Sequence, residues 1–167
     1  MSSSAGWHIV AVDLKNERIS SAWLALLDHY AQDPMGGGKA LSAAARDSLI
    51  PALVDLPAFH GALAMAGTEA VGLINCFTGF STFAARPLLN VHDLVCRAGW
   101  RGQGVAQALL AWAEARARAL GCCKLTLEVL ANNHPALAAY ARAGFAPYEL
   151  DPAAGQAVFL QKVLKEV

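Results

Sequence analysis

The chain has 167 residues, of which 56% are hydrophobic and only 16% charged, and its mean hydropathy is +0.37. This length is typical of one domain that buries its apolar surface without cross-links, so we expect a single domain over residues 1–167. Thirteen basic residues balance thirteen acidic ones, which argues against a nucleic-acid partner. No apolar run reaches about 18 residues and the first residues lack a signal-peptide pattern, so we expect a cytoplasmic protein without a membrane segment.

The first half of the chain has the patterns of two helices and three strands. Apolar residues at helical spacing, among them Trp23 and Tyr30, predict a helix over 19–32. A second helix is expected over 41–56, with a break or kink near Pro51. Strands are expected over 8–12, 59–66 and 69–81, the last two forming a hairpin around Gly67-Thr68.

The second half alternates strands and helices. We expect a strand over 88–96, an amphipathic helix over 104–120, a strand over 124–129 and a short helix over 135–143. A strand pair over 146–150 and 157–163 completes the pattern. The order βααβββαβαββ predicts an α/β (α+β) fold in which helices cover both faces of a mixed sheet.

The four cysteines carry no sign of a metal site. Cys76, Cys96, Cys122 and Cys123 have no C-x-x-C spacing and no histidine at ligand spacing. We therefore expect buried thiols in a reducing compartment, rather than zinc ligands or disulfides.

A glycine-rich turn stands at the junction between the strand 88–96 and the helix 104–120. Its sequence is Arg101-Gly102-Gln103-Gly104-Val105-Ala106. The backbone N–H groups at the start of a helix and the helix dipole both attract an anion. The turn therefore predicts a site for a phosphate or diphosphate.

A second motif follows the next strand: Leu127-Glu128-Val129, then Asn133, Ala136, Tyr140 and Gly144-Phe145. Together the two motifs resemble the signature of the GNAT N-acetyltransferases. The resemblance covers about residues 8–163 and implies that family's fold, with a mostly antiparallel central sheet. Residues 80–95 resemble the branch that acetylates diamines and polyamines, although that branch generally has glutamate in place of His92.

The resemblance implies acetyl-coenzyme A as co-substrate and no metal. Main-chain groups of residues 102–106 would bind the pyrophosphate, with Arg101 adding charge. The pantetheine arm would pair with backbone near Leu94 and Cys96, and an N–H near Val95 would polarise the acetyl carbonyl. On the coenzyme side the resemblance also includes Asn133, Pro135, Ala136 and Tyr140.

The acceptor amine needs a group that takes its proton. An alkyl ammonium with a pKa of about 10.4 costs about 4.6 kcal/mol to present neutral at pH 7. His92 has the most suitable ordinary pKa, while Asp93 and Glu128 are competing candidates. In a regular strand His92 and Asp93 point to opposite faces, so only one would face the cleft. Each of the three is also open to a purely structural role.

Tyr140 is the general acid that the resemblance implies for the departing thiol. A phenol is a weaker acid than a thiol by roughly 1.5 pKa units, so this transfer costs only about 2 kcal/mol. Asn133 precedes the same helix and is expected to cap it.

The segment 33–39 is expected to be a loop on the acceptor side. Its Gly36-Gly37-Gly38-Lys39 run is not a Walker motif, because Asp33 and Ala40 stand where glycine and Ser or Thr are needed. Asp28 and Asp33 are candidates for contacting a cationic acceptor, or are plain surface residues.

The sequence thus favours an N-acetyltransferase for a small amine such as a diamine or amino acid, acting by direct transfer in a ternary complex. Alternatives are a protein N-terminal or lysine acetyltransferase, a non-catalytic acyl-coenzyme A sensor and a nucleotide-phosphate binder. A homodimer is possible by the same resemblance.

Overall fold

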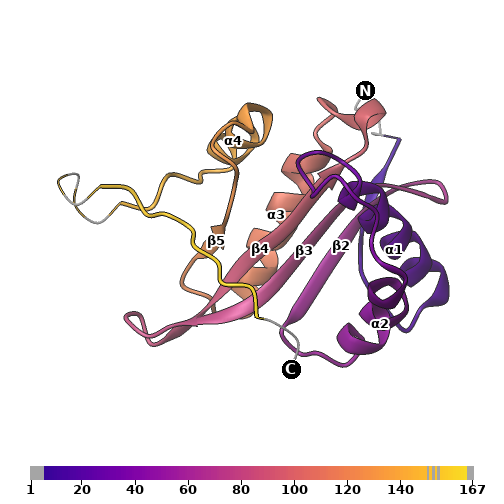
Figure 1. Ribbon diagram of the computed structural model, residues 1–167, viewed down its shortest axis with the longest axis horizontal. Coiled ribbons are helices and arrows are strands. Elements are labelled where there is room, and N and C mark those ends of the chain that lie inside the picture. The colour runs from indigo at the N-terminus through magenta and orange to yellow at the C-terminus, as the bar shows by residue number, and fades with distance from the viewer. Residues whose placement is uncertain (1–5, 150, 152, 154, 165–167) are drawn as a thin grey trace.

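The computed structural model describes residues 6–149, 151, 153 and 155–164, which form a five-stranded sheet between helices (Figure 1). The strands lie in the order β1-β2-β3-β4-β5, and each pairs with its neighbours in sequence. The first four are antiparallel, whereas β5 runs parallel to β4, because a helical crossover connects the two. Their bounds are β1 His8–Ala11, β2 Phe59–Ala66, β3 Glu69–Ser81, β4 Arg86–Cys96 and β5 Leu125–Leu127.

The helices begin at side chains suited to capping. Asn16 caps α1, Ser42 caps α2 and Asn133 caps α4, each accepting a hydrogen bond from a backbone N–H of the first turn. The helix α3 instead follows Gly104, which has a φ of 83°. Their bounds are α1 Glu17–Ala31, α2 Ala43–Leu53, α3 Val105–Ala119 and α4 His134–Arg142, with a 3-10 turn at Ala98–Trp100.

The sheet separates two apolar layers. On one face α3 buries Val105, Leu109 and Ala113 against the sheet, including Leu89 and Val91 of β4. On the other face α1 buries Trp23 and Leu26 against β2, β3 and the end of β4. The expected arrangement, a mixed and mostly antiparallel sheet with helices on both faces, is confirmed.

The pairing of β4 with β3 is interrupted by one extra residue in β4. Asn75 of β3 pairs with Asp93, but the next residue, Cys76, pairs with Val91, so His92 is an extra residue in β4. Such a bulge bends the strand and increases its local twist. The pairing of β4 with β5 ends at Val91, directly before the bulge.

Because of this bend, β5 is shorter than expected. It covers three residues rather than 124–129, and Glu128 and Val129 lie outside the ladder. The hairpin 59–66/69–81 has the expected bounds. The second helix continues through Pro51 to Leu53, so only two helical residues follow the proline and have to accommodate its missing N–H.

The prediction of a strand pair at the end of the chain is wrong. Residues 146–149 and 157–163 form no strand, and Leu150 lies outside the described residues. Val158, Phe159 and Leu160 are each more than 70% exposed, so this apolar run pairs with and packs on none of the described residues. A two-stranded hairpin is marginal without such support, and the segment runs as extended chain (yellow in Figure 1).

Two further observations concern the described residues alone. None of their helices combines the length and the apolar character that a membrane crossing requires. Nor do these residues bring three histidine, cysteine, aspartate or glutamate side chains together in a group that could hold a metal ion.

Candidate active site

A cavity of about 790 Å³ opens beyond the bulge, between the second half of β4, the segment after β5, and α4. Its lining includes eleven residues that the sequence indicated for coenzyme binding or proton transfer: His92, Leu94, Val95, Cys96, Arg101, Ala106, Glu128, Asn133, Pro135, Ala136 and Tyr140. These residues are up to 48 positions apart in the chain. We call this cavity the cleft.

The glycine turn lies beside one end of the cleft: Arg101 and Ala106 line the cavity, whereas residues 102–105 do not. Gly102 and Gly104 have φ values of 76° and 83°, a left-handed conformation that strains other residues. The first hydrogen bond of α3 runs from the Ala108 N–H to the Gly104 carbonyl, so the N–H groups of residues 105–107 precede the helical ladder. Val105 itself is buried against the sheet and offers only its backbone. The Gln103 side chain donates to the Gly99 carbonyl within the turn.

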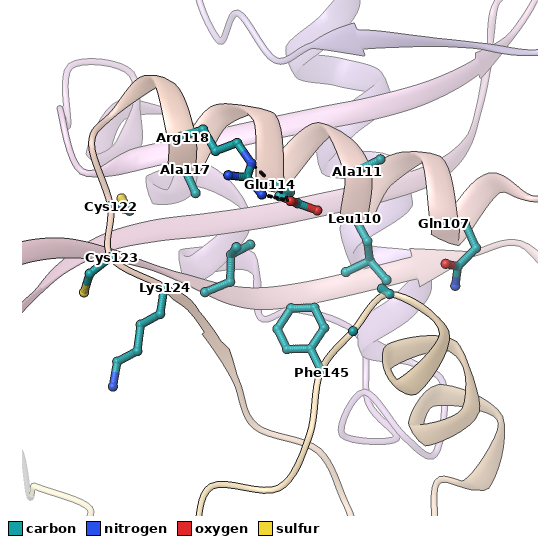
Figure 2. Close-up of a pocket in the computed structure, with 13 residues that line it drawn as sticks. Gln107, Leu110, Ala111, Glu114, Ala117, Arg118, Cys122, Cys123, Lys124 and Phe145 are labelled. Carbon is teal, nitrogen blue, oxygen red and sulfur yellow. Dashed lines mark hydrogen bonds and ion pairs between the residues drawn. The ribbon is translucent and has the colours of Figure 1, made fainter.

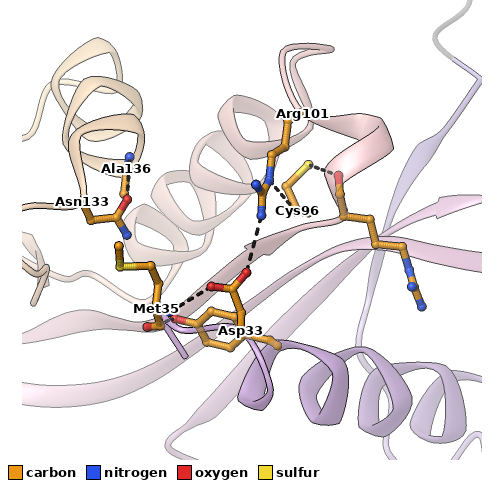
Figure 3. Close-up of polar contacts among 8 residues, drawn as sticks. Asp33, Met35, Cys96, Arg101, Asn133 and Ala136 are labelled. Carbon is orange, nitrogen blue, oxygen red and sulfur yellow. Dashed lines mark hydrogen bonds and ion pairs between the residues drawn. The ribbon is translucent and has the colours of Figure 1, made fainter. Parts of the chain in front are cut away.

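Arg101 lies at the rim of the cleft and reaches across it. Its Nε donates to the Cys96 carbonyl at 3.3 Å, and its guanidinium lies 3.8 Å from the Asp33 carboxylate. Figure 3 shows this side chain pointing toward Asp33 in the loop after α1. Both partners are exposed, so the ion pair is weak and its guanidinium can exchange Asp33 for another anion.

The start of α4 forms the opposite wall. Asn133 Oδ1 accepts from the Ala136 N–H at 3.3 Å, which confirms the expected cap, and Asn133 also lines the cleft (Figure 3). Pro135 occupies the first turn, where a missing N–H costs nothing.

Tyr140, near the end of α4, lies half-buried with its ring packed edge-on against Phe145. Burial raises the pKa of its phenol, and the neighbouring Tyr30 and Asp93 raise it further. The group therefore keeps its proton throughout the neutral range and is a weaker acid than a free phenol.

The bulge changes the expected directions of His92 and Asp93. Asp93 accepts a hydrogen bond from Asn75, and the His92 ring stacks edge-on against Phe77. Asn75 and Phe77 are two residues apart on β3 and so share one face. The two side chains therefore lie on one face of the sheet, because a bulge interrupts the alternation, but only His92 of the two lines the cleft, as expected.

The three candidate proton acceptors differ in how firmly they are held. Asn75 Nδ2 lies 3.0 Å from Asp93 Oδ2, and this amide is 3% exposed. Glu128 is exposed and lies 3.3 Å from the Asn90 amide through both oxygens. His92 is exposed, and Phe77 packs against it.

Asp28 does not line the cleft. Its carboxylate accepts from the Leu41 N–H at 2.9 Å and pairs with Arg46 at 3.1 Å. These contacts tie the end of α1 to the start of α2. Asp33, by contrast, lines the cleft.

Sequence reasoning missed Tyr30 and Met35, which line the cleft, and Asn75, which donates a hydrogen bond to Asp93. Tyr30 was assigned only to the apolar face of α1, although it is the last aromatic residue of that face and carries a polar tip. Asn75 had a usable signal, since it is the one amide side chain within the otherwise apolar run 70–77. A buried polar group in such a run needs a partner.

A second cavity of about 370 Å³ lies between α3, the start of β5 and the end of α4 (Figure 2). Its lining includes Cys122, Cys123 and Phe145, and Glu114 and Arg118 form an ion pair at its edge. None of the residues singled out for coenzyme or acceptor binding lines it.

Comparison with known proteins gives consistent results. The model of the Acetyltransferase (GNAT) family matches residues 22–145. The aminoalkylphosphonate N-acetyltransferase of Salmonella typhimurium is 33% identical over 100 residues, which are 60% of this chain and 64% of that protein. The streptothricin acetyltransferase of Streptomyces lavendulae is 38% identical over 87 residues, 50% of this chain and 46% of that protein.

The chain thus aligns with about half to two thirds of the length of these curated relatives. Among solved structures, the aminoglycoside acetyltransferase meta-AAC0020 from an uncultured soil metagenomic sample superposes with a TM-score of 0.78. The match covers 97% of this chain and 99% of that one at 15% identity, so it supports the fold alone.

Proposed function

This chain belongs to the GNAT acetyltransferase family, and from that premise we propose that it transfers the acetyl group of acetyl-coenzyme A to a primary amine of a small molecule. The observation that carries the proposal is the cleft, which has the open N-terminus of α3 at one end and the Tyr140 phenol along its wall. An anion site and a proton donor in one cavity are what transfer from a phosphorylated thioester requires.

The residues of the cleft suit the coenzyme. Its pyrophosphate needs N–H donors and positive charge, which the backbone of residues 102–106 and Arg101 can supply. Its pantetheine arm needs backbone partners, and beyond Val91 the β4 edge is no longer paired with β5. Asn133, Pro135 and Ala136 would contact the arm from the opposite wall. When bound, acetyl-coenzyme A supplies the acetyl group as a thioester.

The chain's own groups then handle two protons. One acceptor among His92, Asp93 and Glu128 takes the proton of the amine, so that the nitrogen lone pair can form the new bond to carbon. Tyr140 holds a proton at Oη for the departing sulfur, and its phenol is protonated at neutral pH. A backbone N–H near Val95 would stabilise the carbonyl oxygen as it gains charge.

The acceptor class is proposed from two kinds of support. The two curated relatives are named for an aminoalkylphosphonate and for streptothricin, both amine-bearing small molecules. Within this chain, Asp33 and Glu128 line the cleft and favour a cationic group. A protein N-terminus or lysine is the alternative acceptor.

The test is acceptor-dependent release of coenzyme A thiol from acetyl-coenzyme A. The amine panel should include an aminoalkylphosphonate, streptothricin, an aminoglycoside, 1,4-diaminobutane, free amino acids and a lysine-containing peptide. We expect release with at least one small amine and an acetylated product by mass spectrometry. If coenzyme A binds but no amine accelerates release, the chain is an acyl-coenzyme A-binding module instead.

Coenzyme binding is tested separately by calorimetry. Arg101→Ala should weaken the affinity for coenzyme A by roughly tenfold or more, as expected when a charged hydrogen bond worth about 1.5–3 kcal/mol is lost. Arg118→Ala is the matched control, because Arg118 lies at the second cavity and pairs with Glu114. Equal affinities for the two variants would contradict the assignment of the cleft.

A further inference from the structure

A buried amide lies behind the cleft and belongs to no part of the chemistry described so far. Asn75 is in the middle of β3, is 3% exposed and is surrounded in sequence by buried apolar residues. Placing a neutral amide there costs free energy unless its hydrogen bonds are made. Both ends of this amide have a partner.

Those partners allow only one orientation of the amide. Trp23 of α1 is fully buried, and its Nε1–H lies 2.7 Å from Asn75 Oδ1. An indole N–H can only donate, so the amide oxygen must face Trp23. The NH₂ group then faces Asp93, whose carboxylate oxygen lies 3.0 Å away and accepts.

Trp23 and Asn75 thus form a rigid support that begins in the core and ends at a half-buried carboxylate. Only one of the two Asp93 oxygens has a hydrogen-bond partner among the described residues, which leaves the other available for a proton or an ammonium. The charge of Asp93 also acts on both cleft tyrosines, since it contributes to raising the pKa of Tyr30 and of Tyr140. Asp93 is not itself among the residues that line the cleft, but His92 and Leu94 on either side of it are.

The bulge completes the arrangement. It turns Asp93 toward the same face as Phe77 and His92, next to the point where β4 and β5 separate. The two competing acceptors are exposed, and neither is hydrogen-bonded to a buried group among the described residues. A group that takes a proton within a reaction works best when its neighbours lock its position.

Resting on the proposed function, we propose that Asn75, held by Trp23, is a positioning residue for Asp93, and that Asp93 is the carboxylate that meets the acceptor ammonium and takes its proton. The N–H bond of the ammonium breaks and an O–H bond forms on the free Asp93 oxygen. Asn75 acts only through Asp93, by fixing the carboxylate.

The kinetic test is a double-mutant cycle in the best amine of the panel at saturating acetyl-coenzyme A. Asp93→Asn should lower kcat/KM for the amine by about 100-fold or more, in line with the loss of a general base. Asn75→Leu should lower kcat/KM for the amine by about 10-fold. Trp23→Phe should lower it by less, because the Asn75 amide remains and loses only the indole N–H that fixes its orientation. In the Asp93→Asn background, Asn75→Leu should cause no further loss.

A purely structural role predicts a different result. Leu73→Ala is the matched control, because Leu73 is a fully buried neighbour on the same face of β3 without a link to Asp93. It should lower the melting temperature while leaving kcat/KM for the amine nearly unchanged in the folded protein. If Asn75→Leu lowers kcat/KM equally with and without Asp93, the inference is overturned.

An activity-free measurement separates this inference from the proposed function. In ¹⁵N-labelled protein, Asp93→Asn should shift the side-chain amide signals of Asn75 and the indole signal of Trp23, whereas His92→Ala should leave the Trp23 signal in place. If the Asn75 and Trp23 signals do not shift in Asp93→Asn, these two residues do not support Asp93, and the inference is overturned whether or not the enzyme is active. If they respond but no amine is acetylated, the proposed function fails while the support stands.

Discussion

The two halves of β4 are both strands but have different neighbours. The first half is packed in the sheet, and the second half borders the cleft. Residues 86–91 pair with β3 on one side, and the last three of them pair with β5 on the other, so Leu89 and Val91 are almost fully buried. Beyond the bulge at His92, residues 93–96 still pair with β3 but not with β5. Four of the five residues 92–96 line the cleft. We call these the closed half and the open half.

One inserted residue separates the two halves. His92 turns the strand, ends the ladder with β5 and exposes backbone that a regular strand would have paired. The cleft therefore arises from a local irregularity in strand pairing, rather than from a loop added to the sheet. The closed half should respond to mutation through stability and the open half through chemistry, and the following predictions test that division.

The largest effect is expected from Tyr140→Phe, across the cleft from the open half. Loss of a general acid should lower turnover by about 10²–10⁴-fold. Affinity for coenzyme A should stay within about twofold, because the ring and its packing on Phe145 remain. Steady-state kinetics and calorimetry measure the two quantities. Unchanged turnover would remove the assigned role.

The next largest effect is expected from replacing one leucine by alanine in each half of β4. Leu89→Ala in the closed half should lower the free energy of unfolding by about 2–5 kcal/mol, because a fully buried leucine leaves a cavity. Leu94→Ala in the open half should lower it by about 1 kcal/mol, since Leu94 is already partly exposed at the cleft. Urea denaturation gives both values. Equal losses would show that the open half is packed like the closed half.

A smaller effect concerns thiol reactivity. Burial raises the pKa of Cys76 to about 12, so this thiol in the core should resist alkylation until the protein unfolds. Cys96 lines the cleft and should be alkylated slowly and protected severalfold further by coenzyme A. Cys123, in the second cavity, is the internal control and should react at the same rate with and without coenzyme A. Mass spectrometry after iodoacetamide treatment reads all three. Protection of Cys123 but not of Cys96 would move the coenzyme to the other cavity.

The smallest effect is a pH dependence that belongs to the packed part of the sheet. His60 contacts Thr78 and accepts from Arg116, and burial, with the positive charge of Arg116, lowers the pKa of its imidazole. The unfolded chain then binds more protons than the folded one between the lowered value and the ordinary 6.5. Stability should therefore fall as the pH is lowered from about 6.5 through the folded-state pKa. Melting temperatures from pH 7.5 to 5 should show this slope in the wild type and a weaker one in His60→Gln; an identical slope would exclude His60 as its source.

Much of the fold could be predicted because its signals are local. The hairpin 59–66/69–81 follows from two apolar runs around Gly67-Thr68, and the start of α3 follows from Gly104, whose φ of 83° suits glycine. The final strand pair could not be judged in this way. Its residues have strand propensity, but a strand exists only where another strand accepts its hydrogen bonds.

The sequence alone determined the family resemblance, the order of the elements through α4 and the identity of most residues that line the cleft. These properties depend on side-chain type and spacing, which a chain carries before it folds. Tertiary structure alone decided that His92 is an inserted residue, that Asp93 shares its face, and that Trp23 and Asn75 support Asp93 from the core. A bulge depends on the register between two strands, and a hydrogen bond across 52 positions of sequence depends on packing, so neither can be found in a local pattern.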